Sequence, residues 1–195
     1  MPHQGGTRGE ATGASSHLAN GCGSKTAGSV MPARVLFSKI TSSERTTMNN
    51  FARTVAWLQA CGKFPSPTNL SVQIGCHLEE FAEFLQCLET DCREDENTLN
   101  CLVDDLQLIA GSIKKGITQA KIKADRRVDA LDALCDTEVT GNGVAYLAGM
   151  LKHQADEAVL ASNEAKLVDG KPVLLPGGKI GKPEGWTAPD LSRFV

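Results

Sequence analysis

The chain has no run of apolar residues long enough to cross a bilayer, which needs roughly 20 of them in a row. It also has no apolar block near its first residue of the kind that marks a secretory signal. Its formal net charge is only -3 over 195 residues, so no strong overall charge attracts it to nucleic acid or to an anionic membrane. These absences predict a soluble, cytoplasmic protein with neither a nucleic-acid polymer nor a membrane as partner.

Cysteines at the spacing of metal ligands are also lacking. The chain has seven cysteines, which is an odd number, and none of them forms a C-x-x-C pair. This pattern favours reduced thiols in a cytosol over a disulfide framework or a zinc site. Because most of these cysteines fall in segments expected to be helical, we expect them to be largely buried.

Residues 1–45 are rich in Gly, Ser, Thr and Ala and show almost no apolar periodicity. Such a segment cannot bury enough apolar surface to fold, so we predict a disordered tail before one domain at 46–195. Basic residues outnumber acidic ones in this tail. An organelle-targeting peptide and an upstream extension before a start at Met48 are therefore both open interpretations.

Apolar periodicity and capping residues predict an all-α domain, a bundle of four to five helices. From about residue 166 the pattern changes to short β-prone runs around Asp169 and Gly170, which predicts a hairpin followed by an extended tail. The expected helices are about 47–60, 70–88, Asn97 or Thr98 to Gly116, 122–140 with a continuation that is either direct or follows a break at 141–143, and 154–165.

The second expected helix contains "HLEEFAEFLQ" and carries acids on two faces. At 100° per residue, one apolar stripe and one polar strip that includes Glu79 account for most positions. Glu80 and Glu83, one turn apart, instead share a face with apolar neighbours and cysteines, which predicts a second buried side. Buried carboxylates are costly without a partner, so this pair predicts a bound cation. The apolar stripe is Ile74, Leu78, Phe81, Leu85 and Leu88.

The fourth expected helix carries an acidic stripe. Further along the same line come Gly143, Leu147 and Met150. If the helix is continuous, it passes from solvent into the core, with Asp132 and Asp136 nearest the boundary. A solvated acidic face is one interpretation. The other is that these acids join Glu80 and Glu83 as oxygen ligands of Mg²⁺. The stripe is Asp125, Asp129, Asp132 and Asp136.

Several of these motifs resemble one protein family. "EEFAE" at 79–83 matches the E-E-x-x-E element of the all-α nucleoside triphosphate pyrophosphatases, the MazG-like group. "DALDALCDTEVTGNGVAYLAGM" and "SNEAKLVDGKPVLLPGGKIGKPEGWTAPDL" resemble the second acidic helix and the ending of a phage and bacterial branch described as Cof-like or phosphoribosyl-ATP pyrophosphohydrolase-like. The resemblance covers about residues 55–191.

This resemblance implies a hydrolase of nucleotide metabolism that cleaves a (deoxy)nucleoside triphosphate to the monophosphate and pyrophosphate. It implies a Mg²⁺ cofactor, for which Mn²⁺ can substitute, and a homodimer or tetramer. It implies a glutamate, Glu79 or Glu83, that orients the attacking water. The implied metal ligands are Glu80, Glu83, Asp132 and Asp136, and the implied substrate-binding residues are Asn163, Lys166 and Lys179.

One position departs from the family pattern. The second acidic element of the family is E-x-x-D, but Ala133 stands where that glutamate should precede Asp136. We expect Asp132 to replace it, with Asp129 as the alternative. A phosphoribosyl-ATP or dUTP-type pyrophosphohydrolase, and a non-catalytic helical interaction protein, are the two other functions that the sequence leaves open.

Overall fold

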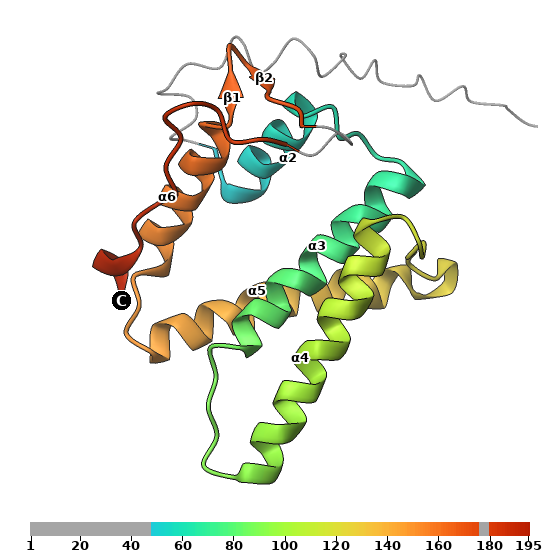
Figure 1. The fold of residues 1–195 in the computed structure, drawn as a ribbon, viewed down its shortest axis with the longest axis vertical. Helices are drawn as coiled ribbons and strands as arrows, with labels where there is room; N and C mark the ends of the chain where they lie inside the picture. Colours follow the sequence, from blue (N-terminus) through green and yellow to red (C-terminus); the bar gives the residue numbers. More distant parts are fainter. Residues whose placement is uncertain (1–47, 176–179) are drawn as a thin grey trace, which may run out of the picture. The chain divides into compact units, whose positions relative to one another are not determined.

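A computed structural model describes residues 48–175 and 180–195 of the chain (Figure 1). Helices dominate the described part, which confirms the all-α class, and none of them is both long enough and apolar enough to span a membrane. The tail predicted at 1–45 and the substrate-binding candidate Lys179 lie outside the described residues. The helices are α2 (Asn50–Ala60), α3 (Pro67–Leu85), α4 (Arg93–Lys114), α5 (Arg127–Leu147) and α6 (Lys152–Glu164).

Local capping signals define several helix ends. The Asn49 side chain accepts a hydrogen bond from the Ala52 amide at 2.8 Å, which caps α2. Ser66 caps α3 in the same way, and Pro67 fits the first helical position because its fixed φ suits a helix start. Beyond α4, Gly116 has a φ of +72°, a conformation that favours glycine and ends the helix as predicted.

Two helices differ from the sequence-based expectation. The segment before Asn97 was predicted to be a loop, but α4 already begins at Arg93. Three acids in its first turn, Glu94, Asp95 and Glu96, favour this earlier start because they interact well with the positive end of the helix dipole. The sequence left a break at 141–143 open, and the structure has none, since α5 continues through both glycines to Leu147.

Helices α3 and α4 pack closely side by side (Figure 1). The predicted apolar stripe of α3 is only partly buried, since Phe81 is 45% exposed and Leu88 40% exposed. Small residues explain the difference, because they let the two helix backbones approach where larger side chains would hold them apart. The buried residues of the two helices are Ser71, Gly75, Ala82 and Leu85 on α3, and Val103, Ala110 and Ile113 on α4.

Gly75 marks the tightest approach, so Gly75→Ala is expected to destabilise the protein by about 1–2 kcal/mol. A β-carbon there would lie 2.8 Å from Lys114 Cγ and 3.1 Å from the Ala110 carbonyl oxygen. Gly111 on α4 provides the control, because a β-carbon there meets nothing within 4 Å. Gly111→Ala should raise the unfolding free energy by roughly 0.5–1 kcal/mol. Urea denaturation measures both, and equal effects of the two variants would contradict the packing.

Helices α2 and α6 are joined by a buried arginine. Arg53 is only 6% exposed and donates from Nε to Glu164 Oε1 at 3.0 Å and from Nη1 to Glu157. Burial by itself lowers the pKa of Arg53, but the hydrogen bonds that Arg53 donates to the two glutamates, together with their negative charges, outweigh it and the pKa is raised. Phe51 of the same helix is 78% exposed. Arg53, and not Phe51, is therefore the side chain through which α2 contacts α6.

A short antiparallel hairpin follows α6, as the sequence predicted (Figure 1). Its strands are β1 (Leu167–Val168) and β2 (Lys171–Pro172). Asp169 and Gly170 between them have φ values of +50° and +73°. A two-residue turn with both φ values positive matches the twist of the flanking strands, which is why Asp-Gly predicts it.

The last residues of the chain run beside α6 and bond to both of its ends. Trp186 donates from Nε1 to the Ser162 carbonyl oxygen at 3.0 Å, near the end of the helix. The Leu151 amide, at the start of α6, donates to the Phe194 carbonyl oxygen at 2.8 Å. The extended tail of the prediction is therefore docked along α6.

Helix α5 leaves most of its side chains in contact with solvent. Its only buried residue is Ala145. The predicted passage from solvent into the core is wrong for the described chain, because Leu147 is 84% and Met150 46% exposed. Large apolar side chains are exposed on several faces of this helix, and they are Val128, Leu131, Leu134, Val139, Val144 and Tyr146.

Candidate functional site

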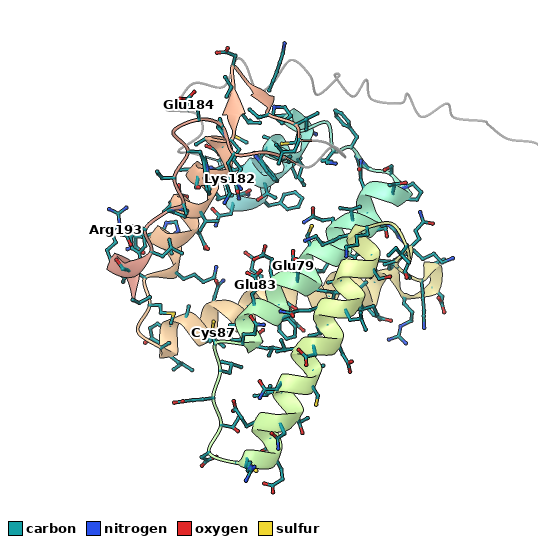
Figure 2. All side chains as sticks on the ribbon, in the orientation of Figure 1. Glu79, Glu83, Cys87, Lys182, Glu184 and Arg193 are labelled. Carbon is teal, nitrogen blue, oxygen red and sulfur yellow. The ribbon has the colours of Figure 1, made fainter. Side chains whose placement is uncertain are left out.

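Three glutamates gather on α3, and Figure 2 shows Glu79 and Glu83 next to each other on that helix. Glu80 and Glu83 are exposed, so the second buried side predicted for them is wrong in the described chain. The neighbours expected to bury them, such as Val72 and Cys76, are only half-buried, because α3 turns its small residues toward α4 instead. The two carboxylates are therefore accessible to a ligand.

Glu79 forms an ion pair with Lys114 of α4. It was predicted to lie on a solvated strip, but it is half-buried and paired. The hydrogen bond that Lys114 donates to Glu79 raises the pKa of Lys114, against a smaller lowering by burial. This pairing occupies one carboxylate oxygen of Glu79, so Glu83 is the less engaged of the two predicted water-orienting glutamates.

Glu80 lies in an electrostatic environment that disfavours its charge. Partial removal from solvent is the largest cause that raises the pKa of Glu80, followed by the negative charges of Glu83 and Glu79. The charges of Lys114 and Lys166 act in the opposite direction. A cation bound among these glutamates would relieve the repulsion between them.

The predicted substrate-binding residues Asn163 and Lys166 lie together at the end of α6. Lys166 Nζ donates to Asn163 Oδ1 at 2.9 Å. Burial, and then the charge of Lys182, lower the pKa of Lys166, while the charge of Glu80 acts to raise it. Glu80 of α3 and Lys166 therefore lie within electrostatic reach of each other.

Trp186 is a residue of this region that the sequence did not assign. Lys182 Nζ lies 4.5 Å and Lys166 Nζ 5.3 Å from the centre of its ring, both within the range of a cation–π contact. Figure 2 labels Lys182 on the segment that runs beside α6. The available signal was the spacing K-P-E-G-W, which sets a lysine four residues before the only aromatic side chain of that stretch.

The second acidic element is not joined to the first. Asp125, Asp129, Asp132 and Asp136 are all exposed on or just before α5, and Asp129 pairs with Arg126. Within residues 48–175 and 180–195, no three side chains of His, Cys, Asp or Glu converge on a common point. The structure thus brings Glu80 within electrostatic reach of both Glu83 and Lys166 but does not add Asp132 or Asp136.

Glu80 and Glu83 nevertheless suit a magnesium ion. Mg²⁺ is commonly held in enzymes by one or two carboxylates, with waters and substrate phosphates completing an octahedron. Two exposed carboxylates one helical turn apart, free of ion pairs among the described residues, can supply that share of the ligands. A site of this kind needs no enclosed protein cage.

The cysteines add no metal ligands to this region. All six in the described part are free thiols, and burial raises the pKa of the Cys61 thiol, which favours its neutral form. The prediction that the cysteines are largely buried is wrong for Cys87, Cys101 and Cys135, which are exposed.

Comparison of the chain with protein-family profiles, with curated proteins and with solved structures found no match. The motifs and the geometry of the site are accordingly what any functional assignment depends on.

Proposed function

We propose that the chain is a Mg²⁺-dependent nucleoside triphosphate pyrophosphatase of the MazG-like type. The observation that carries the proposal is the position of Glu80, exposed one turn from Glu83 and within electrostatic reach of Lys166. To bind a triphosphate through a metal ion, a site needs carboxylates that hold the metal and a positively charged side chain that contacts the phosphates. The E-E-x-x-E resemblance supports the same interpretation.

Bound Mg²⁺ would supply positive charge to the phosphate oxygens and lower the pKa of a coordinated water. In this proposal Glu80 and Glu83 hold the metal, and Lys166 and Asn163 bind the phosphates. Glu83 or Glu79 orients a water toward the α-phosphorus and accepts its proton. The new bond joins water oxygen to the α-phosphorus, and the bond to the α–β bridging oxygen breaks, so pyrophosphate leaves with the electron pair.

We also propose that the protein acts as a homodimer or tetramer. The exposed apolar side chains of α5 support this, because a monomer rarely leaves so many large apolar residues in contact with water. Association could cover them and bring Asp132 and Asp136 toward a metal, which a single described chain does not do.

A nucleotide panel tests the activity. The common ribo- and deoxynucleoside triphosphates, together with dUTP and phosphoribosyl-ATP, are each incubated with the protein and Mg²⁺, and pyrophosphate release is measured. We expect turnover of at least one deoxynucleotide, loss of activity with a chelator and recovery with Mn²⁺. Exclusive turnover of phosphoribosyl-ATP or dUTP would transfer the proposal to that substrate. No release from any compound would reject it.

A non-catalytic interaction protein is the second candidate, and the exposure of α5 is the observation that favours it. In that case the acidic faces of α3 and α5 are only solvated. Calorimetric titration with Mg²⁺ separates the two candidates. Saturable binding with Kd in the millimolar range or below supports the enzyme, whereas no heat of binding supports the interaction protein.

Two aspartate variants test the departure from the family pattern. Asp132→Asn should raise the Mg²⁺ concentration for half-maximal rate by about tenfold, a typical cost of perturbing a metal site. Asp129→Asn should change it much less, because Asp129 already pairs with Arg126. Rates measured over a Mg²⁺ series decide the matter. A stronger effect from Asp129→Asn would make D-x-x-D the second element.

A further inference from the structure

Two lysines from different segments share one indole ring. Lys166 follows the end of α6, and Lys182 lies in the segment that follows the hairpin (Figure 2). Their ammonium nitrogens lie 5.3 Å and 4.5 Å from the centre of the Trp186 ring. Trp186 is itself held by its hydrogen bond to the Ser162 carbonyl oxygen at 3.0 Å. One indole ring is therefore in cation–π contact with two positive charges.

These charges are not neutralised by the part of the chain that the structure describes. No ion pair there joins either lysine to a carboxylate, and Lys166 bonds only the neutral oxygen of Asn163. Burial is the largest cause of the lowered pKa of Lys166, and the like charge of Lys182 lowers it further. This repulsion destabilises the folded protein unless a bound anion offsets it.

We propose that Lys166 and Lys182 together bind a pyrophosphate group, with Trp186 as the residue that positions both ammonium groups. Both nitrogens lie within 5.3 Å of one ring centre, and an anion with two linked phosphates offers one phosphate to each ammonium group. This assignment rests on the proposed function for the origin of the ligand, which is the β- and γ-phosphates of the substrate and the released product. It adds Lys182 and Trp186 to the site.

The test uses inorganic pyrophosphate and the fluorescence of Trp186. The chain has two tryptophans, so Trp57→Phe leaves Trp186 as the only one. Titration at constant ionic strength and without metal should give a saturable change in emission. Lys182→Gln should weaken binding about tenfold, as expected for the loss of one charged hydrogen-bond donor. Calorimetry on the chain that keeps Trp57 repeats the comparison without depending on that substitution.

Matched variants separate a specific site from general charge. Lys171 is an exposed lysine on β2 of the same carboxy-terminal region, so Lys171→Gln should leave the affinity unchanged. Trp186→Leu should weaken binding, while Trp186→Phe, which keeps an aromatic face for the ammonium groups, should retain more of it. A structural role alone would make the two Trp186 variants equivalent in binding and in thermal stability.

The outcomes also distinguish this inference from the proposed function. Equal affinity in Lys182→Gln and Lys171→Gln, or a signal that inorganic phosphate and sulfate reproduce at the same concentrations, would overturn the pyrophosphate site whatever the enzyme assay gives. Saturable pyrophosphate binding that depends on Lys182, in a protein that hydrolyses no nucleotide, would support the site and reject the enzyme.

Discussion

Glu80→Gln is expected to abolish nucleotide hydrolysis while the protein remains folded. The substitution keeps the shape of the side chain and removes the charge that would hold Mg²⁺. Perturbing groups that support metal ligands costs about 10- to 100-fold, so loss of a ligand should lower turnover by at least about a hundredfold. Pyrophosphate release under saturating nucleotide measures the effect. Glu89→Gln is the control, because Glu89 is an exposed acid just beyond α3 and should be replaceable without loss.

The same variant has a predictable effect on stability. The pKa of Glu80 is raised by partial removal from solvent and by Glu83 and Glu79, so the folded protein favours the protonated form. Protonated Glu80 therefore contributes fully to the stability of the folded protein at acidic pH, and this contribution is lost as the pH rises through the raised pKa. At pH 7 without metal, Glu80→Gln should melt at the same temperature as the parent or slightly higher, and the difference should vanish below about pH 4. A lower melting temperature at pH 7, or turnover close to that of the parent, would contradict the assignment.

Arg53→Met is expected to cost about 2–4 kcal/mol of unfolding free energy, the largest stability effect among these variants. Arg53 is buried between α2 and α6, and its removal leaves Glu164 without its partner although that side chain is only 13% exposed. An unpaired carboxylate in such a buried position lowers the free energy of unfolding, whereas an exposed one does not. Urea denaturation followed by circular dichroism measures the loss.

The two glutamates supply a matched comparison for this prediction. Glu157 is 47% exposed, so Glu157→Gln should cost less than Glu164→Gln, despite the same chemical change and the same partner. Arg53→Met combined with Glu164→Leu should recover much of the loss, because it removes the orphaned charge. Equal costs for the two glutamate variants would show that burial does not control this interaction.

The sequence predicted helices and turns best where a local signal decided them. Asp169 and Gly170 define their turn by backbone conformation alone, and Gly116 ends α4 for the same reason. Faces were harder to predict than helices. Hydrophobicity favoured Phe81 over Ala82 as a core residue of α3, but the close approach at Gly75 requires small side chains along the contact with α4. Which face a helix buries depends on the helix that it packs against, and the spacing of residues along one helix does not identify that partner.

The candidate site was predictable in its residue types and less so in its assembly. Asn163 and Lys166 were predicted as a pair and are hydrogen-bonded, because three residues separate them on a helix end. Trp186 joins them through a chain reversal after α6 that no local pattern predicts. The ion pair of Glu79 with Lys114 likewise depends on how α3 packs against α4. The roles of Asp132 and Asp136 remain predictions, since they depend on contacts that a single described chain does not make.

The docking of the last residues along α6 makes one backbone amide informative about the whole segment. Leu151 donates its amide to Phe194, and that bond can persist only while the end of the chain stays against the start of α6. Hydrogen exchange at Leu151 therefore reports the local opening of the carboxy terminus, separately from global unfolding. If Trp186 orders this segment around a bound anion, the ligand should slow exchange at Leu151, at the other end of α6 from the lysines it contacts.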